Sequence, residues 1–266
     1  MPRAPLPVNF GRMLATDIDS ATASAAAAGG ADKRAYVKRI FSEIAPRYDL
    51  LNHVLSLNID RRWRRAAIAE LRIDRNPCGT YLDLCAGTLD VSAMLSTTTG
   101  FRGLVIGADF AEPMLTAGAP KISRTKVAPL AADAVELPIE SGSIAGAIVA
   151  FGIRNVAGLD ESLREALRVL APGGRFVILE FSTPRMRILR SLYLFYFRRI
   201  LPLIGRLVSG HRTAYTYLPR SVANFPVEEE LANRMESAGF ARVRWSGVSF
   251  GVAAIHVGER SGLDEE

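Results

Sequence analysis

Three residues that could bind a ligand follow one another at an informative spacing. Asp83 lies in the apolar run 81–84, Gly87 follows in a turn of small residues, and Asp109 ends the next apolar run, 22 residues after Gly87. In doubly wound α/β proteins, an acidic residue about 20 residues beyond the glycine turn binds ribose hydroxyls. The spacing therefore predicts a ribose site at the carboxyl edge of a parallel sheet, with Asp83, Gly87 and Asp109 beside the ligand.

The turn between the two aspartates disfavours one class of ligand. A dinucleotide-binding turn has the pattern GxGxxG, whereas this chain has Gly87 and no glycine at 88–90. A pyrophosphate would be poorly bound here, so S-adenosylmethionine, which has a ribose and no phosphate, fits better. Thr88 is predicted to contact its methionine end. The alternative is that Asp83 and Asp109 are polar strand ends that bind nothing.

Two further strands are predicted to bring polar residues to the same edge. The run VAPLAADAVELP, residues 127–138, leads into Asp133 and Ala134, which we expect to contact adenine. A turn or helix N-cap role is the alternative for Asp133. The run SIAGAIVAF, 143–151, is apolar throughout, as a central parallel strand is. It is followed by Arg154 and Asn155, which should emerge beside the cofactor unless Arg154 pairs with a surface carboxylate such as Asp160.

Composition narrows the functional classes without choosing among them. The 266 residues are 49% hydrophobic, which is enough for one large α/β core, and no run approaches the ~18 apolar residues of a membrane span. Two cysteines and three scattered histidines give neither a disulfide framework nor a zinc spacing. A net charge of +6 is compatible with nucleic acid, with an anionic membrane or with neither. Cytoplasm is the expected compartment.

The order of the elements predicts a single domain. Strands and helices alternate as in a doubly wound parallel sheet, and the last two strands, 241–248 and 251–258, should form an antiparallel hairpin with its turn near Ser249. The small-residue tract predicts that residues 1–32 form a disordered tail. The domain is predicted to span residues 33–260, and residues 261–266 are predicted to form a flexible end.

Two segments carry arginines next to apolar faces. Residues 48–65 predict an amphipathic helix that covers the sheet. Residues 185–208, inserted before the last helix and the last two strands, mix six arginines with aromatic and aliphatic side chains and are broken at Pro202. Such a segment can lie in a membrane interface. The alternative is an ordinary helical insertion with its arginines in water.

With these elements in place, the chain resembles the menaquinone and ubiquinone biosynthesis C-methyltransferases. The resemblance is carried by YDLLNHVLSLNIDRRW, LDLCAGTLD, FGIRNV and RVLAPGGRFVILEF, and it continues to about Gly258. The family usually has Met, His, Lys and Gly where this chain has Leu51, Asp60, Ala171 and Leu89. The resemblance implies an α/β fold of the class I S-adenosylmethionine-dependent methyltransferase type, Rossmann-like, with seven strands of which one is antiparallel.

The resemblance also implies a reaction. Members methylate a prenylated benzoquinol or naphthoquinol, so a demethylmenaquinol or its benzoquinol counterpart is the expected substrate. Arg154 is predicted to stabilise the developing phenolate, with Asn155 and Tyr48 orienting the ring oxygens. No proton acceptor can be identified, although His211 is a candidate. A prenyl tail favours transient contact with the inner face of the membrane.

Rival functions stay open at this point. A nicotinamide oxidoreductase is the nearest enzyme alternative, followed by a methyltransferase for another small molecule. A nucleic-acid methyltransferase would explain the positive charge, yet there is no NPPY-like motif, so we expect no nucleic-acid partner. A non-enzymatic S-adenosylmethionine-binding or lipid-binding scaffold is the last rival. The sequence does not decide whether the chain forms a homodimer.

Overall fold

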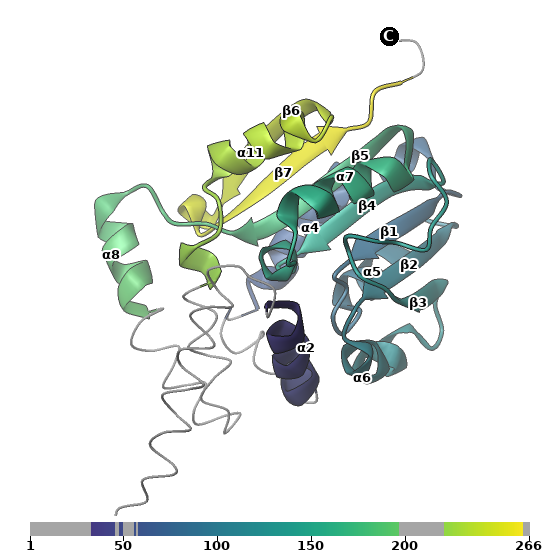
Figure 1. Ribbon diagram of the computed structural model, residues 1–266, viewed down its shortest axis with the longest axis horizontal. Coiled ribbons are helices and arrows are strands. Elements are labelled where there is room, and N and C mark those ends of the chain that lie inside the picture. Colours follow the sequence, from purple (N-terminus) through teal and green to yellow (C-terminus); the bar gives the residue numbers. More distant parts are fainter. Residues whose placement is uncertain (1–32, 46–47, 50–55, 57, 197–220, 263–266) are drawn as a thin grey trace, which may run out of the picture.

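The computed structural model of the protein describes residues 33–45, 48–49, 56, 58–196 and 221–262 (Figure 1). The predicted tail, 1–32, lies outside these residues, and the predicted flexible end is described only at 261–262. Most of the apolar residues of the predicted helix at 48–65, and the break at Pro202, also lie outside the described part of the chain.

A seven-stranded sheet forms the centre of the molecule, in the order β3-β2-β1-β4-β5-β7-β6. The strands are β1 (Thr80–Leu84), β2 (Leu104–Asp109), β3 (Val127–Ala131), β4 (Ile144–Ala150), β5 (Leu170–Phe181), β6 (Ala241–Val248) and β7 (Ala253–Glu259). β1 to β5 pair in parallel, and β7 runs antiparallel to both β5 and β6. The predicted Rossmann-like architecture is therefore confirmed, with β7 as the reversed strand.

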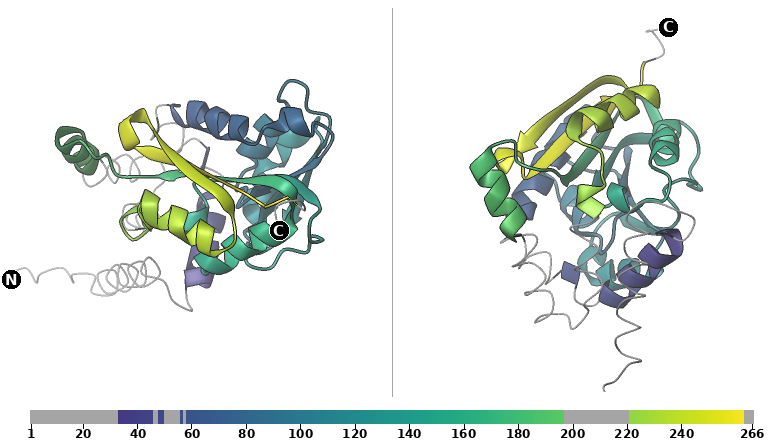
Figure 2. Two further views of the ribbon diagram at one scale, coloured as in Figure 1. Left: turned by 90° about the horizontal axis from the view of Figure 1, so that it is seen from above. Right: turned by 60° about the vertical axis from the view of Figure 1, so that its left-hand side comes forward.

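Helices cover both faces of the sheet (Figure 2). They are α2 (Lys33–Ile44), α4 (Asp60–Glu70), α5 (Asp90–Ser96), α6 (Glu112–Ile122), α7 (Leu159–Val169), α8 (Arg187–Phe195) and α11 (Glu228–Ser237), with short 3-10 turns η2 (Ile73–Arg75), η3 (Ile153–Asn155) and η5 (Ser249–Gly251). α4 and α5 pack with Tyr81, Ile148 and Val177 on one face. α7 and α11 pack with Leu82 and Phe176 on the other. Both faces are buried, which explains why the central strands are apolar at nearly every position.

The register of the parallel strands places the predicted site residues at one edge. Leu84 of β1 pairs with Ala108 of β2 and with Val149 of β4, so these three strands end side by side. The segments that follow them carry Gly87, Asp109 and η3. The carboxyl ends of parallel strands at a point where the strand order reverses are the usual ligand site of such sheets. β1 lies at this reversal, between β2 and β4.

The turn between β6 and β7 and the irregular start of β5 both contain residues with positive φ. The hairpin turn near Ser249 is confirmed: Ser249, Phe250 and Gly251 all have positive φ and join β6 to β7. β5 begins directly after α7, at Leu170, so the stretch APGG lies within the strand. The register of β5 against β4 shifts between Ile144 and Gly146. Gly173, with φ of +77°, lets the chain make this irregular start.

Candidate functional site

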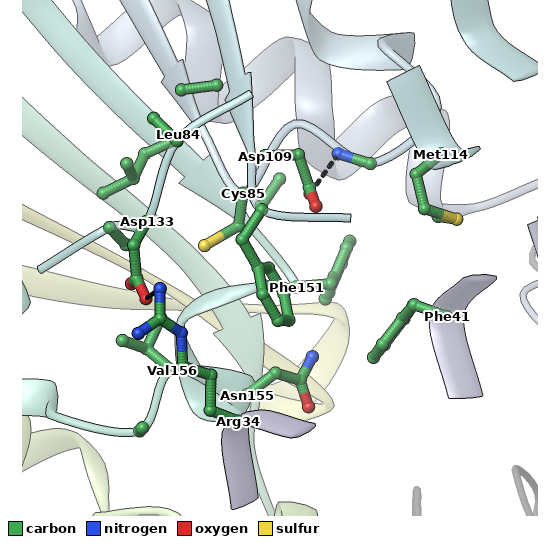
Figure 3. Close-up of a pocket in the computed structure, with 18 of the residues that line it drawn as sticks. Arg34, Phe41, Leu84, Cys85, Asp109, Met114, Asp133, Phe151, Asn155 and Val156 are labelled. Carbon is green, nitrogen blue, oxygen red and sulfur yellow. Dashed lines mark hydrogen bonds and ion pairs between the residues drawn. The ribbon is translucent and has the colours of Figure 1, made fainter. Parts of the chain in front are cut away.

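The turn after β1 is shaped by backbone in the left-handed region. Cys85, Gly87 and Leu89 have φ of 53°, 53° and 63°. The amide of Gly87 donates a 2.8 Å hydrogen bond to Oδ2 of Asp109 (Figure 3), and the amide of Ala111 donates one of 2.8 Å to Oδ1. These bonds orient the carboxylate of Asp109 at the end of β2. They also lower the pKa of Asp109, but burial has the larger effect and raises it.

A pocket opens above this turn. Its lining includes six predicted residues: Tyr48, Gly87, Asp109, Asp133, Ala134 and, from η3, Asn155 (Figure 3). A Cβ on Gly87 would lie 3.4 Å from Met114 Cε, so the absence of a side chain at Gly87 leaves this side of the pocket open to a ligand. A fixed carboxylate, a turn without a side chain at Gly87 and apolar walls suit a nucleoside without phosphates. The residues present therefore fit S-adenosylmethionine.

The side of the pocket that is predicted to hold adenine contains a contact that the sequence did not reveal. Arg34, near the start of α2, forms a 2.8 Å ion pair with Oδ2 of Asp133 (Figure 3). The amide of Val135 also donates a 3.2 Å hydrogen bond to Oδ1 of Asp133, which is the turn role considered as an alternative. Asp133 thus takes part in a turn and faces the pocket as well. Its contact with adenine stays a prediction, as does that of Ala134.

Thr88 is placed next to the turn and not in the pocket lining. It is 2% exposed, and its hydroxyl donates a 2.5 Å hydrogen bond to Asp49. Lys121 of α6 contacts Thr88, Asp49 and Asp90 at 3.1, 2.6 and 2.6 Å. This small network ties the segment around Tyr48 to α5 and α6. The predicted contact of Thr88 with the methionine end of the cofactor is not tested by these bonds.

Leu89 is fully buried in a conformation that favours glycine. It is 0% exposed and packs with Leu115 and Ile122 of α6. A Cβ on Gly107 would lie 2.5 Å from Leu89 Cδ2, so this side chain fills the space above β2. Leu89 precedes α5 as its N-cap residue, so it lies outside the helix interior. Its side chain points away from the pocket and leaves the turn unobstructed.

Replacing Leu89 with glycine should therefore destabilise the protein by about 2 kcal/mol while leaving S-adenosylmethionine affinity unchanged. Removing a buried leucine side chain costs roughly 2–5 kcal/mol, and relief of the left-handed conformation returns roughly 1–2 kcal/mol. Urea denaturation and calorimetric titration measure the two quantities. Asn58→Gly is the matched control, because Asn58 also has a positive φ, of 60°, but is exposed. A Leu89→Gly variant as stable as the wild type would contradict this packing.

Asp83 lies beneath the turn, outside the pocket lining. It is 1% exposed, and Ser92 of α5 donates a 2.6 Å hydrogen bond to its Oδ2. Burial raises the pKa of Asp83 to about 7, although the Ser92 bond and Arg64 oppose the shift. The structure therefore gives Asp83 a role in joining β1 to α5, and its predicted contact with the cofactor stays a prediction.

Asp83 should make stability depend on pH. Because its pKa is raised on folding, the folded state holds a proton that the unfolded state loses, and stability falls as pH rises from about 4 to about 7. Asp83→Asn removes this dependence and keeps an acceptor for Ser92. Its advantage over the wild type should grow by about 2–3 kcal/mol between pH 5 and pH 8, at ~1.4 kcal/mol per pKa unit. Urea denaturation at both pH values tests this, with the exposed Asp74→Asn as control. An equal difference at both would contradict it.

Arg154 has a different partner from the one considered on sequence grounds. Its Nη1 donates a 2.6 Å hydrogen bond to Oε1 of Glu180 and one of 2.5 Å to the carbonyl of Phe151. The guanidinium is 7% exposed and the Glu180 side chain 2%. Pairing with Asp160 was wrong, since Asp160 binds Arg234 at 3.1 Å. The guanidinium is held in the interior, against the ring of Phe181 at 5.4 Å.

Asn155 and Tyr48 are the predicted substrate residues that do line the pocket. Asn155 is 8% exposed, and its Oδ1 is buried without a hydrogen-bond partner among the described residues. Tyr48 packs edge-on against Phe41 of α2, with ring centroids 5.9 Å apart. Both are placed where they could contact a ligand in the pocket, and their roles stay predictions. His211 lies outside the described residues.

Comparison with known proteins shows the family of this chain. The sequence model of the ubiE/COQ5 methyltransferase family matches residues 30–260. A demethylmenaquinone methyltransferase from Thermus thermophilus is 48% identical over 223 residues, which cover 83% of this chain and all of the relative. The chain belongs to the ubiE/COQ5 methyltransferase family. The ubiquinone/menaquinone biosynthesis C-methyltransferase UbiE of Geobacter sulfurreducens is 42% identical, covering 86% of this chain and 90% of that protein.

The fold is shared with distant methyltransferases. The crystal structure of an S-adenosylmethionine-dependent methyltransferase from Thermotoga maritima matches with a TM-score of 0.56 at 19% identity, covering 85% of this chain and all of that one. At this identity the likeness concerns the fold alone. Family membership makes the protein an S-adenosylmethionine-dependent methyltransferase, and the oxidoreductase and scaffold alternatives are not favoured.

Several residues of this methyltransferase site escaped sequence reasoning. Arg34, Phe41 and Phe151 line the pocket from α2 and from the end of β4, and Glu180 supports Arg154 from β5. Cys85 also lines the pocket, but burial raises the pKa of its thiol well above the usual range, so it is a neutral wall residue. Glu180 alone offered a signal, because it is an acidic residue at the end of the otherwise apolar run RFVILEF.

Proposed function

We propose that the protein transfers the methyl group of S-adenosylmethionine to a ring carbon of a prenylated quinol, converting a demethylmenaquinol to a menaquinol. The observation that carries the proposal is the 48% identity to a demethylmenaquinone methyltransferase over that protein's whole length. The pocket supports it, because a carboxylate suited to ribose hydroxyls, Asp109, and a polar η3 residue, Asn155, line one cavity. The equivalent benzoquinol is the second candidate substrate, because the Geobacter relative is named for both pathways.

In this proposal the residues of the chain contribute alignment and electrostatics. Asp109 and the turn around Gly87 hold the cofactor, with Asp133 and Ala134 on its adenine side and Thr88 near its methionine end. S-adenosylmethionine supplies an electrophilic methyl group. Asn155 and Tyr48 orient the ring oxygens, and the charge of Arg154 stabilises the phenolate that makes the ring carbon nucleophilic. Apolar walls such as Phe151 exclude water from the reacting groups.

Incubation of the full chain with methyl-labelled S-adenosylmethionine and a reduced acceptor tests the proposal. We expect label in the quinone fraction with demethylmenaquinol, and comparison with a prenylated benzoquinol defines the ring preference. Calorimetric titration with S-adenosylmethionine and with NADH, on the same sample, tests the cofactor separately. A protein that binds S-adenosylmethionine and labels neither quinol would overturn the substrate assignment.

Membrane contact is the part of the proposal that concerns α8. The exposed apolar side chains at this end are Met186, Ile188 and Phe195, which are 62%, 77% and 59% exposed, and Phe250 of η5, which is 81% exposed. Arg185, Arg187 and Arg190 accompany them and are exposed too. The amide of Ser182 binds the carbonyl of Val252 at 3.0 Å, which holds η5 beside the start of this segment. Apolar residues among arginines suit an anionic bilayer surface. No helix among the described residues is long and apolar enough to cross a bilayer.

Vesicle sedimentation tests this contact. Binding to phosphatidylglycerol vesicles should exceed binding to phosphatidylcholine vesicles. The double substitution Ile188→Ser with Phe250→Ser should reduce binding several-fold, because two exposed apolar side chains that would insert into the bilayer are lost. Leu104→Ser is the matched control, since Leu104 is 40% exposed at the opposite end of the strands. Equal binding of the control and the double variant would argue against this surface. Homodimerisation stays a prediction, which sedimentation velocity in the absence of lipid would test.

A further inference from the structure

The ion pair at Arg154 raises an electrostatic difficulty for the predicted mechanism. Arg154 is expected to stabilise a phenolate, yet its Nη1 is 2.6 Å from Oε1 of Glu180, and both side chains are buried. A guanidinium beside an ionised carboxylate forms a pair with no net charge. Such a pair can stabilise a new anion strongly only if the carboxylate gives up its own charge.

The same cluster contains polar atoms that lack partners. Among the described residues, Oε2 of Glu180, Nε of Arg154 and Oδ1 of Asn155 are buried without a hydrogen bond. Each buried unpaired group costs roughly 1–3 kcal/mol, so their gathering in one place indicates an external partner. Two of them are acceptors and one is a donor. A phenolic hydroxyl, which donates one hydrogen bond and accepts others, has the complementary chemistry.

Two members of the cluster, Asn155 and Arg154, each line a cavity at this edge of the sheet, and Glu180, which lines neither, is bound to Arg154. Asn155 lines the nucleoside pocket beside Phe151 (Figure 3), and Arg154 lines a neighbouring cavity with Lys33 and Phe225. Val156 and Ala157 line both, so the two cavities meet at the end of η3. A quinol ring at this junction would lie between the cofactor pocket and the Arg154–Glu180 pair.

We propose that Glu180 is the proton acceptor of the reaction and works as one unit with Arg154. The O–H bond of the quinol breaks, Oε2 of Glu180 gains the proton, and the electron pair stays on the phenolate oxygen beside Arg154. The ring carbon then bonds to the methyl group while the S–CH3 bond of S-adenosylmethionine breaks, with its electron pair staying on sulfur and S-adenosylhomocysteine as the leaving group. The hydrogen on that carbon leaves as a proton to solvent water, and the ring oxygen recovers its proton from Glu180. This inference rests on the proposed function.

Charge conservation is the physical reason to prefer this acceptor. Before transfer the site holds Arg154 cationic, Glu180 anionic and the quinol neutral, and afterwards Glu180 is neutral and the quinol anionic. The total charge in the buried site is unchanged, so no net charge has to be stabilised away from water. Burial also raises the pKa of Glu180, more than Arg154 and the amide of Phe181 lower it, which makes the carboxylate a better base.

Other titratable groups surround Glu180 and could influence its proton affinity. Tyr193 of α8 has a pKa raised by burial, and Cys85 at the end of β1 has a pKa raised in the same way. Lys33 of α2 donates hydrogen bonds of 3.0 and 2.8 Å to the carbonyls of Arg154 and Val156, and burial lowers its pKa. His256 of β7 lies on the same sheet face, two positions along from the partner of Glu180, and burial lowers its pKa.

The decisive experiment compares wild type with Glu180→Gln across pH 5.5 to 9. The amide keeps a carbonyl oxygen for Arg154 but cannot take a proton. In the wild type, kcat should decrease as pH falls, with a midpoint above that of an ordinary glutamate. In Glu180→Gln, kcat should fall by roughly 10²-fold or more and lose this acidic limb, as for loss of a general base. Affinity for S-adenosylmethionine should stay unchanged, which also shows that the variant is folded.

Two further variants separate proton transfer from simple positioning. Glu180→Asp keeps a carboxylate and should recover part of kcat together with the acidic limb. Glu259→Gln is the matched control, because Glu259 is another buried strand carboxylate, bound by Arg175 at 2.7 Å, and its substitution should leave the profile intact. If Glu180→Gln retains kcat to within about threefold, or keeps the limb, the assignment is wrong.

An infrared difference measurement gives a readout that does not require turnover. When the quinol binds with S-adenosylhomocysteine present, a protonated-carboxyl band should appear in the wild type and not in Glu180→Gln. If the wild type methylates the quinol but the band is absent, the role of Glu180 would be overturned while the proposed function would stand. Failure of the wild type to bind or methylate either quinol would overturn the proposed function.

Discussion

Replacing Arg154 with methionine should lower both turnover and stability. The guanidinium is the ionic partner of a carboxylate that is 2% exposed, so its removal leaves a buried uncompensated charge, at a cost of about 3–5 kcal/mol. Turnover should also fall by roughly 10²-fold or more, comparable to the loss of one oxyanion donor. The sequence predicted that Arg154 emerges beside the cofactor, whereas the structure buries its side chain in an ion pair, so its replacement should cost stability as well as turnover.

The double variant Arg154→Met with Glu180→Gln separates the two effects. It removes both charges, so much of the stability should return while turnover stays low. Urea denaturation at pH 7.5 and at pH 5.5 provides the measurement, and the loss in the single variant should be smaller at pH 5.5, where Glu180 accepts a proton more easily. Arg234→Met is the control, because Arg234 pairs with Asp160 near the surface and should contribute ~1 kcal/mol or less. An Arg154→Met variant as stable as this control would refute the buried pair.

Replacing Asp109 with alanine should weaken S-adenosylmethionine binding by tenfold or more. Charge-assisted hydrogen bonds contribute roughly 1.5–3 kcal/mol, and the carboxylate is oriented at the pocket by the amides of Gly87 and Ala111. The alanine variant also leaves these two amides without their acceptor, so part of the loss would come from a less ordered turn.

Asp109→Asn distinguishes the two contributions. Asparagine offers one acceptor oxygen in place of two, so the turn keeps one amide bond while the charge is lost, and the affinity should fall between those of wild type and Asp109→Ala. Isothermal titration calorimetry measures all three proteins. Asp160→Ala, at an exposed ion pair, is the control and should bind normally. Unchanged affinity in Asp109→Ala would remove this carboxylate from the cofactor site.

Local patterns determined the frame of this protein. Apolar runs that end at Leu84, Asp109 and Ala150, separated by helical segments, were sufficient to predict a parallel sheet whose ends gather at one edge. The ribose-type spacing from Gly87 to Asp109 predicted their proximity, and the 2.8 Å bond between them confirms it. Such features are predictable because turn chemistry and strand periodicity depend on residues close together in the chain.

The tertiary structure alone decided which charged residues form pairs and in which direction their side chains point. Central strands that are buried on both faces show no alternation of apolar and polar residues. Nothing in the sequence therefore indicated that Asp83 turns toward Ser92 and away from the pocket. Arg154 could have met Asp160, six residues away. It meets Glu180, 26 residues away, because β4 and β5 pair in parallel and end side by side. Ion pairs between distant segments depend on strand register and burial, which emerge only when the whole sheet has assembled.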